Sequence, residues 1–330
     1  MSEYESSSSE RVRHAAETIR RIREEIGKAV VGQRVMIDQV LVALISGGHV
    51  LLEGVPGLGK TLTVLALSRT FQGKFARVQF TPDLMPSDLT GHAVYDMQSG
   101  EFHVRRGPIF THLLLADEIN RAPAKTQAAL LEVMQERQVS IEGESHTLEP
   151  PFMVLATQNP IELEGTYPLP EAQLDRFLLK VMIDYPSEEE EQALVGTVTR
   201  STVGSDLHVD DVGAVVETGQ VRELQQAAAE IIVDEQVVDY AVRLVRTTRR
   251  WGGVASGAGP RGAIALVRCC RAAALLAGRD YVLPDDVKKM TLPALRHRVI
   301  LTPDMEIDGR SADDVLREIL DEVEAPKSEA

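Results

Sequence analysis

The fold of this 330-residue chain is decided by one stretch of sequence, His49-Val50-Leu51-Leu52-Glu53-Gly54-Val55-Pro56-Gly57-Leu58-Gly59-Lys60-Thr61-Leu62. It begins as an apolar, strand-like segment and continues into a helix-like segment that runs to Thr70. The loop between them lets successive backbone N–H groups turn toward phosphate, while its Lys reaches the β and γ phosphates and its Thr holds Mg²⁺. This order predicts a nucleoside triphosphate site over Gly54, Val55, Pro56, Gly57, Leu58, Gly59, Lys60, Thr61 and Leu62. A dinucleotide site fits less well, because Leu62 stands where a third glycine is needed.

Polar side chains follow two further apolar runs. Residues 109–116 end in Asp117-Glu118, and residues 152–157 end in Gln158-Asn159-Pro160. Because the carboxyl ends of parallel strands line the ligand crevice, we expect Asp117 to steady Mg²⁺ through water and Glu118 to polarise the attacking water. Asn159 would hydrogen-bond the γ-phosphate or that water. A solvated acidic turn is the plainer but less favoured interpretation of the pair, and an Asn-Pro turn is compatible with the role of Asn159.

The apolar pattern predicts an α/β domain over residues 10–186. Helices are expected from Glu10 to about Lys28 and from Gln33 to Ser46. Strands are expected at His49–Glu53, Arg77–Phe80, Leu113–Asp117, Met153–Gln158 and Leu178–Asp184. Since helices alternate with these strands, the sheet should be parallel and covered on both faces. Apolar and polar residues that alternate on both sides of a polar turn also predict two hairpins, at about 91–106 and 138–149.

A helical second domain is predicted over residues 187–322. Ser187 and Glu190 form a capping-box pattern that starts a helix, whereas residues 197–219 look like a loop. Amphipathic helices are expected at Asp234–Arg250 and Pro260–Ala277, followed by a short helix after Pro284. Residues 1–9 are predicted to be a disordered tail, and residues 323–330 a frayed acidic one.

Taken together, the motifs resemble the MoxR branch of the AAA+ ATPases. The resemblance runs from Val30-Val31-Gly32-Gln33 through most of the chain. Besides the glycine loop, it is carried by Gln79-Phe80-Thr81-Pro82-Asp83-Leu84-Met85-Pro86-Ser87-Asp88-Leu89-Thr90-Gly91, Ala116-Asp117-Glu118-Ile119-Asn120-Arg121-Ala122-Pro123, Ala156-Thr157-Gln158-Asn159-Pro160 and Leu169-Pro170-Glu171-Ala172-Gln173-Leu174-Asp175-Arg176-Phe177. The resemblance implies a P-loop NTPase fold with a five-stranded parallel sheet in the order 5-1-4-3-2 and a C-terminal α-helical lid.

The resemblance also implies roles for single residues. Those that would contact ATP or Mg²⁺ are Lys60 and Thr61 as Walker A, Asp117 and Glu118 as Walker B, Asn159 as sensor 1, and Val31, Gly32 and Gln33 as the segment bordering the adenine. Arg176 matches the arginine finger that enters the neighbouring subunit's site, and Arg261 matches sensor 2. From the residues alone, the favoured interpretation is that Arg176 forms a surface ion pair with Asp175 or Glu171 and that Arg261 simply begins a helix. Arg121 is a further interface candidate.

A guanidinium supplied from outside the phosphate loop adds about 10³–10⁵ in rate to phosphoryl transfer. The resemblance therefore implies a homo-oligomeric ring, expected to be a hexamer, that hydrolyses ATP to ADP and phosphate with Mg²⁺. In this family such a ring remodels a protein client, usually one with a von Willebrand factor A domain. The two hairpins resemble the helix-2 insert, which meets clients, and the pre-sensor-1 insert, although passive surface hairpins would look the same.

Two other functions stay open. One keeps the fold but changes the client, as in a DNA-directed motor or a magnesium-chelatase subunit. The other is a nucleotide-dependent scaffold with negligible turnover. The formal net charge of −15 and sequence pI near 5.1 argue against nonspecific binding to nucleic acid or an anionic membrane. The short basic runs Arg249-Arg250 and Arg296-His297-Arg298 are interpreted as solvated helix ends.

The remaining composition indicates a cytoplasmic protein. Cys269 and Cys270 are the only cysteines, and their adjacent positions give neither a normal bridge nor a zinc-binding spacing. The N-terminus is polar and acidic, unlike a secretion signal. Since no apolar run approaches the ~20 residues of a membrane span, we expect no membrane insertion.

Overall fold

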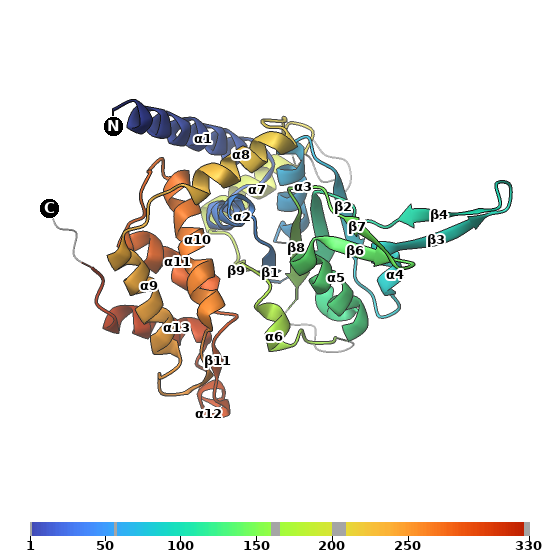
Figure 1. Ribbon diagram of the computed structural model, residues 1–330. Coiled ribbons are helices and arrows are strands. Elements are labelled where there is room, and N and C mark those ends of the chain that lie inside the picture. Colours follow the sequence, from blue (N-terminus) through green and yellow to red (C-terminus); the bar gives the residue numbers. More distant parts are fainter. Residues whose placement is uncertain (1, 56–57, 160–165, 200–208, 327–330) are drawn as a thin grey trace.

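A central parallel sheet organises the structure, a computed structural model that describes residues 2–55, 58–159, 166–199 and 209–326 (Figure 1). Its strands are β1 (Val50–Glu53), β2 (Phe75–Gln79), β5 (Leu113–Asp117), β8 (Met153–Gln158) and β9 (Leu179–Met182). They lie in the order β2-β5-β8-β1-β9, and every neighbouring pair is parallel. Numbered along the chain and read from β9, this order is 5-1-4-3-2, so the predicted topology is confirmed.

The central strands are buried on both faces because their apolar runs supply two separate cores. In β1, Val50 and Leu52 belong to one apolar cluster and Leu51 belongs to the other. The strand β5 alternates in the same way, with Leu113 and Leu115 on one side and Leu114 on the other. Side chains alternate across a strand, so a continuous apolar run is what a doubly covered sheet requires.

Helices of the first domain cover both faces of the sheet (Figure 1). Their bounds are α1 (Ser2–Ala29), α2 (Arg34–Ile45), α3 (Lys60–Thr70), α4 (Pro86–Thr90), α5 (Ala124–Glu136) and α6 (Glu171–Leu174). Buried residues of α1, α2 and α3 join the cluster of Val50, whereas those of α5 join the cluster of Leu51. The helix α1 begins at Ser2, so residues 2–9, expected to be disordered, extend it. Propagating a formed helix adds one hydrogen bond per residue, which makes such an extension inexpensive.

Both predicted hairpins are present. One joins β3 (Gly91–Asp96) to β4 (Glu101–Arg106), and the other joins β6 (Gln138–Ile141) to β7 (Glu144–Thr147). The β3–β4 hairpin projects far from the body of the molecule (Figure 1). Its turn places Gly100 at a φ of 74°, a left-handed conformation that favours glycine.

The C-terminal part is a helical lid beside the sheet (Figure 1). Its helices are α7 (Glu188–Thr199), α8 (Thr218–Ala229), α9 (Glu235–Thr248), α10 (Pro260–Leu276), α11 (Pro284–Leu295), α12 (Pro303–Ile307) and α13 (Ala312–Glu322), with short strands β10 (Val254–Ser256) and β11 (Ile300–Leu301). The capping box predicted before α7 forms, because Glu190 N donates to Ser187 Oγ and Ser187 N to Glu190 Oε2. The helix α8 was not predicted from the sequence.

The run Arg296-His297-Arg298 joins lid to sheet, so its interpretation as a solvated helix end is wrong. Arg298 is buried and donates from Nε to Asp175 Oδ1 at 2.7 Å and from Nη2 to Phe177 O at 2.7 Å. His297 is also buried, and its Nε2 lies 3.0 Å from the same Phe177 oxygen. Burial of these side chains is possible because acceptors of the sheet domain meet them.

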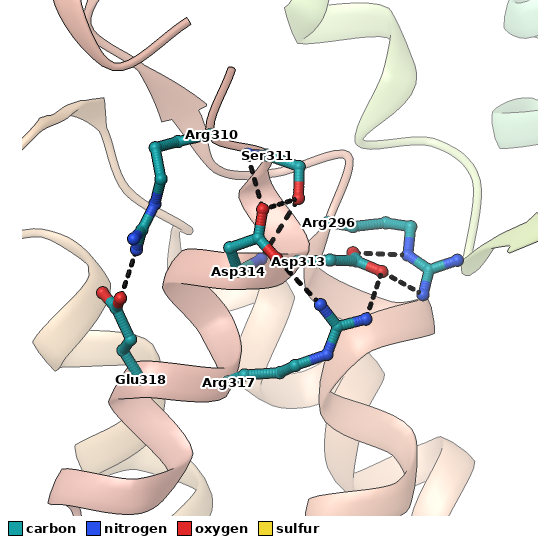
Figure 2. Close-up of polar contacts among 7 residues, drawn as sticks. All are labelled: Arg296, Arg310, Ser311, Asp313, Asp314, Arg317 and Glu318. Carbon is teal, nitrogen blue, oxygen red and sulfur yellow. Dashed lines mark hydrogen bonds and ion pairs between the residues drawn. The ribbon is translucent and has the colours of Figure 1, made fainter. Parts of the chain in front are cut away.

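Arg296 extends this junction into the last helix. Its Nε and Nη2 each donate at 2.9 Å to the carboxylate of Asp313, at the start of α13 (Figure 2). Its Nη1 also lies 3.4 Å from Lys180 O of β9. Asp314 caps the same helix start by accepting from Ser311 N, and it pairs with Arg317 at 3.0 Å (Figure 2). A paired charge of this kind fixes α13 against both α11 and the edge strand.

Candidate active site

A cavity of about 700 Å³ lies at the carboxyl ends of the sheet strands. Its lining includes eight of the residues that the sequence assigned to a nucleotide site, Val31, Gln33, Leu58, Gly59, Lys60, Thr61, Leu62 and Asn159, together with the acidic pair Asp117 and Glu118. Val31 and Gln33 lie between α1 and α2, and the other residues come from the loop after β1 with the start of α3, the end of β5 and the end of β8. Parallel topology explains the convergence, because all three strands point the same way.

The glycine loop leads directly into α3. Gly59 is the N-cap of α3 and has a φ of 75°, which a side chain would make unfavourable. Gly54 has no room for a Cβ, which would lie 2.7 Å from Ile183 O. Val55 and Leu58 flank the remaining two loop residues, Pro56 and Gly57, which lie outside the described part of the chain. The 11-residue helix α3 therefore presents its positive N-terminal end to the cavity.

Lys60 lies over its own loop. Its Nζ donates to Gly54 O at 2.5 Å and to Gln158 O at 3.3 Å. Burial lowers the pKa of Lys60, and the nearby carboxylates of Asp117, Glu118 and Glu53 oppose that shift. The ammonium group thus faces an acidic cavity with backbone oxygens as its present partners, which suits a group that will meet phosphate.

Asp117 is buried and rigidly held. Thr157 Oγ1 donates to Asp117 Oδ1 at 2.6 Å, and the same hydroxyl accepts from Glu118 N at 2.8 Å. The second oxygen, Oδ2, accepts from Arg77 Nη2 at 2.7 Å and Arg77 Nε at 3.2 Å. Both carboxylate oxygens are therefore oriented by neighbouring strands.

Glu118 adopts a left-handed backbone conformation with a φ of 56°, uncommon for a residue with a side chain. Its Oε2 accepts from Gln79 Nε2 at 2.6 Å and from Arg121 Nη1 at 2.9 Å. An observed outlier of this kind is typical of functional sites, where surrounding contacts hold the residue in place. Arg121, considered above for an interface, here pairs within its own chain.

The segment assigned to the adenine borders the same cavity. Gln33 Nε2 donates to Asp184 O at 3.3 Å, which joins the start of α2 to the chain after β9. Gly32 lies between two lining residues at a φ of 78°, and a Cβ there would meet Glu190. Tyr185, Pro186 and Glu191 complete this wall. The wall is less polar than the acidic end and could receive a base.

The two arginines Arg176 and Arg261 lie elsewhere. Both line a separate cavity of about 380 Å³, which shares no lining residue with the first cavity among the described residues. Between them, Asp175 pairs with Arg298 at 2.7 Å and with Arg261 at 3.6 Å. Within the described part of the chain, Arg176 forms an ion pair with neither Asp175 nor Glu171, so that alternative is not met.

The first cavity fits a magnesium nucleotide. Its volume lies in the range of small-molecule sites, about 300–1,000 Å³. It combines a lysine and a helix N-terminus for phosphate, a hydroxyl and a carboxylate for a hard cation, and apolar side chains at the other end.

Six lining residues were not assigned to the site from the sequence: Val30, Arg77, Thr157, Tyr185, Pro186 and Glu191. Arg77 enters from β2, Thr157 from β8 and Tyr185 from the segment after β9. Thr157 lies within a recognised motif but was given no role, whereas Arg77 lies in no motif and reaches the site only through strand pairing, which the sequence alone did not specify in detail. Two of them were adjacent to recognised features, since Thr157 precedes Gln158-Asn159 and Arg77 begins the predicted second strand.

The fold and this cavity define a P-loop ATPase of the AAA+ class. Comparison with sequence families agrees, because residues 49–179 match the ATPase family associated with various cellular activities (AAA) and residues 246–319 match the AAA lid domain.

Within that class, the chain belongs to the MoxR family of AAA+ ATPases. It is 45% identical over 324 residues to Chaperone MoxR1 of Mycobacterium tuberculosis, covering 95% of this chain and 84% of that protein. It is 33% identical to Protein MoxR of Methylorubrum extorquens, covering 93% of this chain and 94% of that protein. A crystal structure from Cytophaga hutchinsonii, named as a candidate ATPase, is 41% identical, with a TM-score of 0.89 over 98% of this chain and 99% of that one.

Over the described residues, no helix combines the length and the apolar character that crossing a bilayer needs.

Proposed function

We propose that this protein is a Mg²⁺-dependent ATPase that works as a ring and remodels a protein client. The observation that carries the proposal is the convergence of Lys60, Thr61, Asp117, Glu118 and Asn159 on one cavity of about 700 Å³. No simpler binding function requires a phosphate loop, an acidic pair and a buried amide to meet at the carboxyl ends of neighbouring strands.

Each side chain has a distinct task in this proposal. Lys60 and the N-terminus of α3 bind the phosphates, and Thr61 and Asp117, the latter through water, hold Mg²⁺. The bound cation would neutralise charge that develops on the phosphate oxygens. Glu118 accepts a proton from the attacking water or orients it, and Asn159, which is buried at the end of β8, positions that water.

The ring is supported by the placement of Arg176 and Arg261. Both lie in the cavity of about 380 Å³, away from the nucleotide cavity of their own chain. Phosphoryl transfer gains from a guanidinium near the transferred group. We infer that a neighbouring subunit receives both arginines, that Arg261 acts in trans, and that the ring is a hexamer in the cytoplasm.

The client is proposed to bind the β3–β4 hairpin. Tyr95, Met97 and Phe102 are 53%, 90% and 72% exposed, and the rings of Tyr95 and Phe102 lie 5.1 Å apart. Exposed apolar groups on a projecting element are typical of protein-binding surfaces. The relative named Chaperone MoxR1 supports a remodelling function, and the family resemblance points to a client with a von Willebrand factor A domain.

Turnover is the test that separates an ATPase from a scaffold. We expect wild-type protein to release phosphate from ATP only when Mg²⁺ is present, and Lys60→Ala to lose both nucleotide affinity and release. Calorimetry with ADP and a phosphate-release assay measure the two properties separately. Tight, Mg²⁺-dependent nucleotide binding without any phosphate release by the assembled wild type would favour the scaffold.

A further inference from the structure

Arg77 is a cation that faces the proposed magnesium position from the edge strand β2. In the pairing of β2 with β5, Arg77 lies opposite Leu115 and Gln79 opposite Asp117. Side chains two residues apart share a face of a strand, so Arg77 and Gln79 reach the same side of the sheet. Arg77 bonds Asp117 there, and it lines the nucleotide cavity.

The two partners differ in their freedom to move. The Asp117 side chain is 13% exposed and is fixed by Thr157, whereas the Arg77 side chain is 48% exposed. Among the described residues, Arg77 has one further hydrogen-bond partner, Gln79 Oε1, at 3.5 Å from its Nη2. Moving the guanidinium would therefore break few contacts, while moving the carboxylate would break the Thr157 bond and expose a buried strand end.

The position of Arg77 conflicts with a cation beside Asp117. Its guanidinium donates from Nη2 and Nε to Asp117 Oδ2, the carboxylate oxygen that does not bond Thr157. Two positive groups at one carboxylate repel each other, and the repulsion is strongest where burial limits screening by solvent. In the absence of Mg²⁺, however, a buried carboxylate without a cation is costly, so a resident arginine stabilises the empty site.

We propose that Arg77 is a positioning residue that substitutes for Mg²⁺ at Asp117 in the nucleotide-free protein and releases Asp117 Oδ2 when a magnesium nucleotide binds. This inference rests on the proposed function of the cavity. It assigns Arg77 a role in setting how strongly nucleotide binding depends on Mg²⁺, distinct from contact with the reacting atoms.

The test compares Arg77→Gln with wild type in thermal unfolding, first without ligand, then with ADP and Mg²⁺, and then with ADP and a chelator. We expect the variant to unfold several degrees below wild type without ligand and with the chelator. The difference in unfolding temperature between variant and wild type should shrink by at least half with ADP and Mg²⁺. A fluorescence titration should also show half-maximal ADP binding at a several-fold lower Mg²⁺ concentration in the variant.

Arg279→Gln is the matched control. Asp286, like Asp117, is a buried carboxylate, and it accepts from Arg279 at 2.7 and 2.9 Å in the lid, away from the cavity. This variant should lose the same stability with and without ligand. Arg77→Lys, which keeps a cation, should lie between wild type and Arg77→Gln and serves as the test variant if the glutamine protein does not fold.

Each result decides the inference. If the unfolding temperature of Arg77→Gln lies below that of wild type by the same amount in all three conditions, the ion pair is permanent and the inference is overturned. Phosphate release lost while the Mg²⁺ dependence stays unchanged would show a catalytic residue and overturn it as well. Failure of wild type itself to gain stability from ADP and Mg²⁺ would overturn the proposed function, and this inference with it.

Discussion

Glu118 combines a strained backbone with a side chain held by two donors, Gln79 and Arg121. Both donor side chains are exposed, so solvent or substrate can replace them as partners of Glu118. The carboxylate is thus kept in a defined place before any nucleotide arrives, which reduces the reorganisation that the reaction step would require. The proposed role of Glu118 is to act on water, whereas Lys60 and Thr61 supply binding.

Glu118→Gln should separate binding from turnover. Glutamine keeps the size and can still accept from Gln79, but it cannot take a proton from water. We expect ADP and ATP affinity within a few-fold of wild type and phosphate release lower by about 10²-fold or more. Calorimetry and a phosphate-release assay measure this. Equal loss of affinity and release would instead assign Glu118 to binding.

His49 makes stability depend on pH. It is buried, its Nδ1 accepts from Val154 N at 3.0 Å, and its Nε2 lies 3.1 Å from Met134 O, which fits a neutral ring. Burial lowers the pKa of His49 to about 4. Below pH 6.5 the unfolded chain takes up a proton that the folded chain does not, so stability falls as pH falls from 6.5 toward 4, by about 1.4 kcal/mol per unit.

His49→Gln should therefore reduce the slope of unfolding free energy against pH between 6.5 and 5 by about 1.4 kcal/mol per unit, although it lowers stability at pH 7.5. Burial also lowers the pKa of His297, so some slope should remain. Urea unfolding at several pH values measures the slope. The exposed His14→Gln is the control, and a slope unchanged in His49→Gln would contradict the assignment.

At the scale of elements, strand ends were the most predictable features. The bounds of β5 and β8 agree with the sequence prediction because each apolar run ends in polar residues, Asp117-Glu118 and Gln158-Asn159. The helix α8 was missed because its buried residues Val221, Leu224 and Ala228 are spaced among glutamine and alanine and follow a loop-like stretch. The helix α11 is longer than predicted, since Pro293 lies inside it without ending it.

The residues of the candidate site also differ in whether the sequence alone could identify them. Residues within a local motif, such as Lys60 and Asp117, could be identified from the chain alone. Arg77 could not, because its place at Asp117 depends on how β2 pairs with β5, a contact between segments 40 residues apart. Arg298 was misread for a related reason, since a run of basic residues resembles a surface until the acceptor Asp175 is placed opposite it.

The β3–β4 hairpin should bind the client without taking part in hydrolysis. Replacing Tyr95 and Phe102, which lie opposite each other, by threonine keeps strand-forming residues but removes both exposed rings. We expect client capture by a Glu118→Gln background in ATP to be lost and nucleotide affinity to be unchanged. Ile307→Thr, at an apolar residue of α12 that is 82% exposed, is the control for general surface effects.

At the scale of the molecule, the lid is fixed to the segment that carries the proposed arginine finger. Arg298→Met removes the buried cation that pairs with Asp175 and bonds Phe177 O, on either side of Arg176. Loss of one partner of a buried pair costs about 3–5 kcal/mol. Arg317→Met, at an exposed lid pair, should cost about 1 kcal/mol or less. Urea unfolding measures both, and equal small effects would contradict a rigid junction.

In the proposed ring, each active site combines residues from two neighbouring subunits, and this sharing can be tested with variants. Arg176 and Lys60 line different cavities of one subunit, so each variant should damage a different half of a shared site. Arg176→Ala should bind nucleotide normally yet lose phosphate release by about 10³-fold, the loss expected for an arginine finger. Lys60→Ala should lose nucleotide binding.

Mixing the two variants tests whether the arginine acts across subunits. In a mixed ring, some interfaces combine an intact phosphate loop from an Arg176→Ala subunit with an intact arginine from a Lys60→Ala neighbour. Those interfaces should hydrolyse ATP, so phosphate release should rise above the sum of the separate variants and peak near equal proportions. Mixing Arg176→Ala with an Arg176→Ala, Lys60→Ala double variant supplies no arginine and should give no recovery. If mixed rings form, as light scattering of labelled subunits can establish, and release still does not rise, Arg176 does not act in trans.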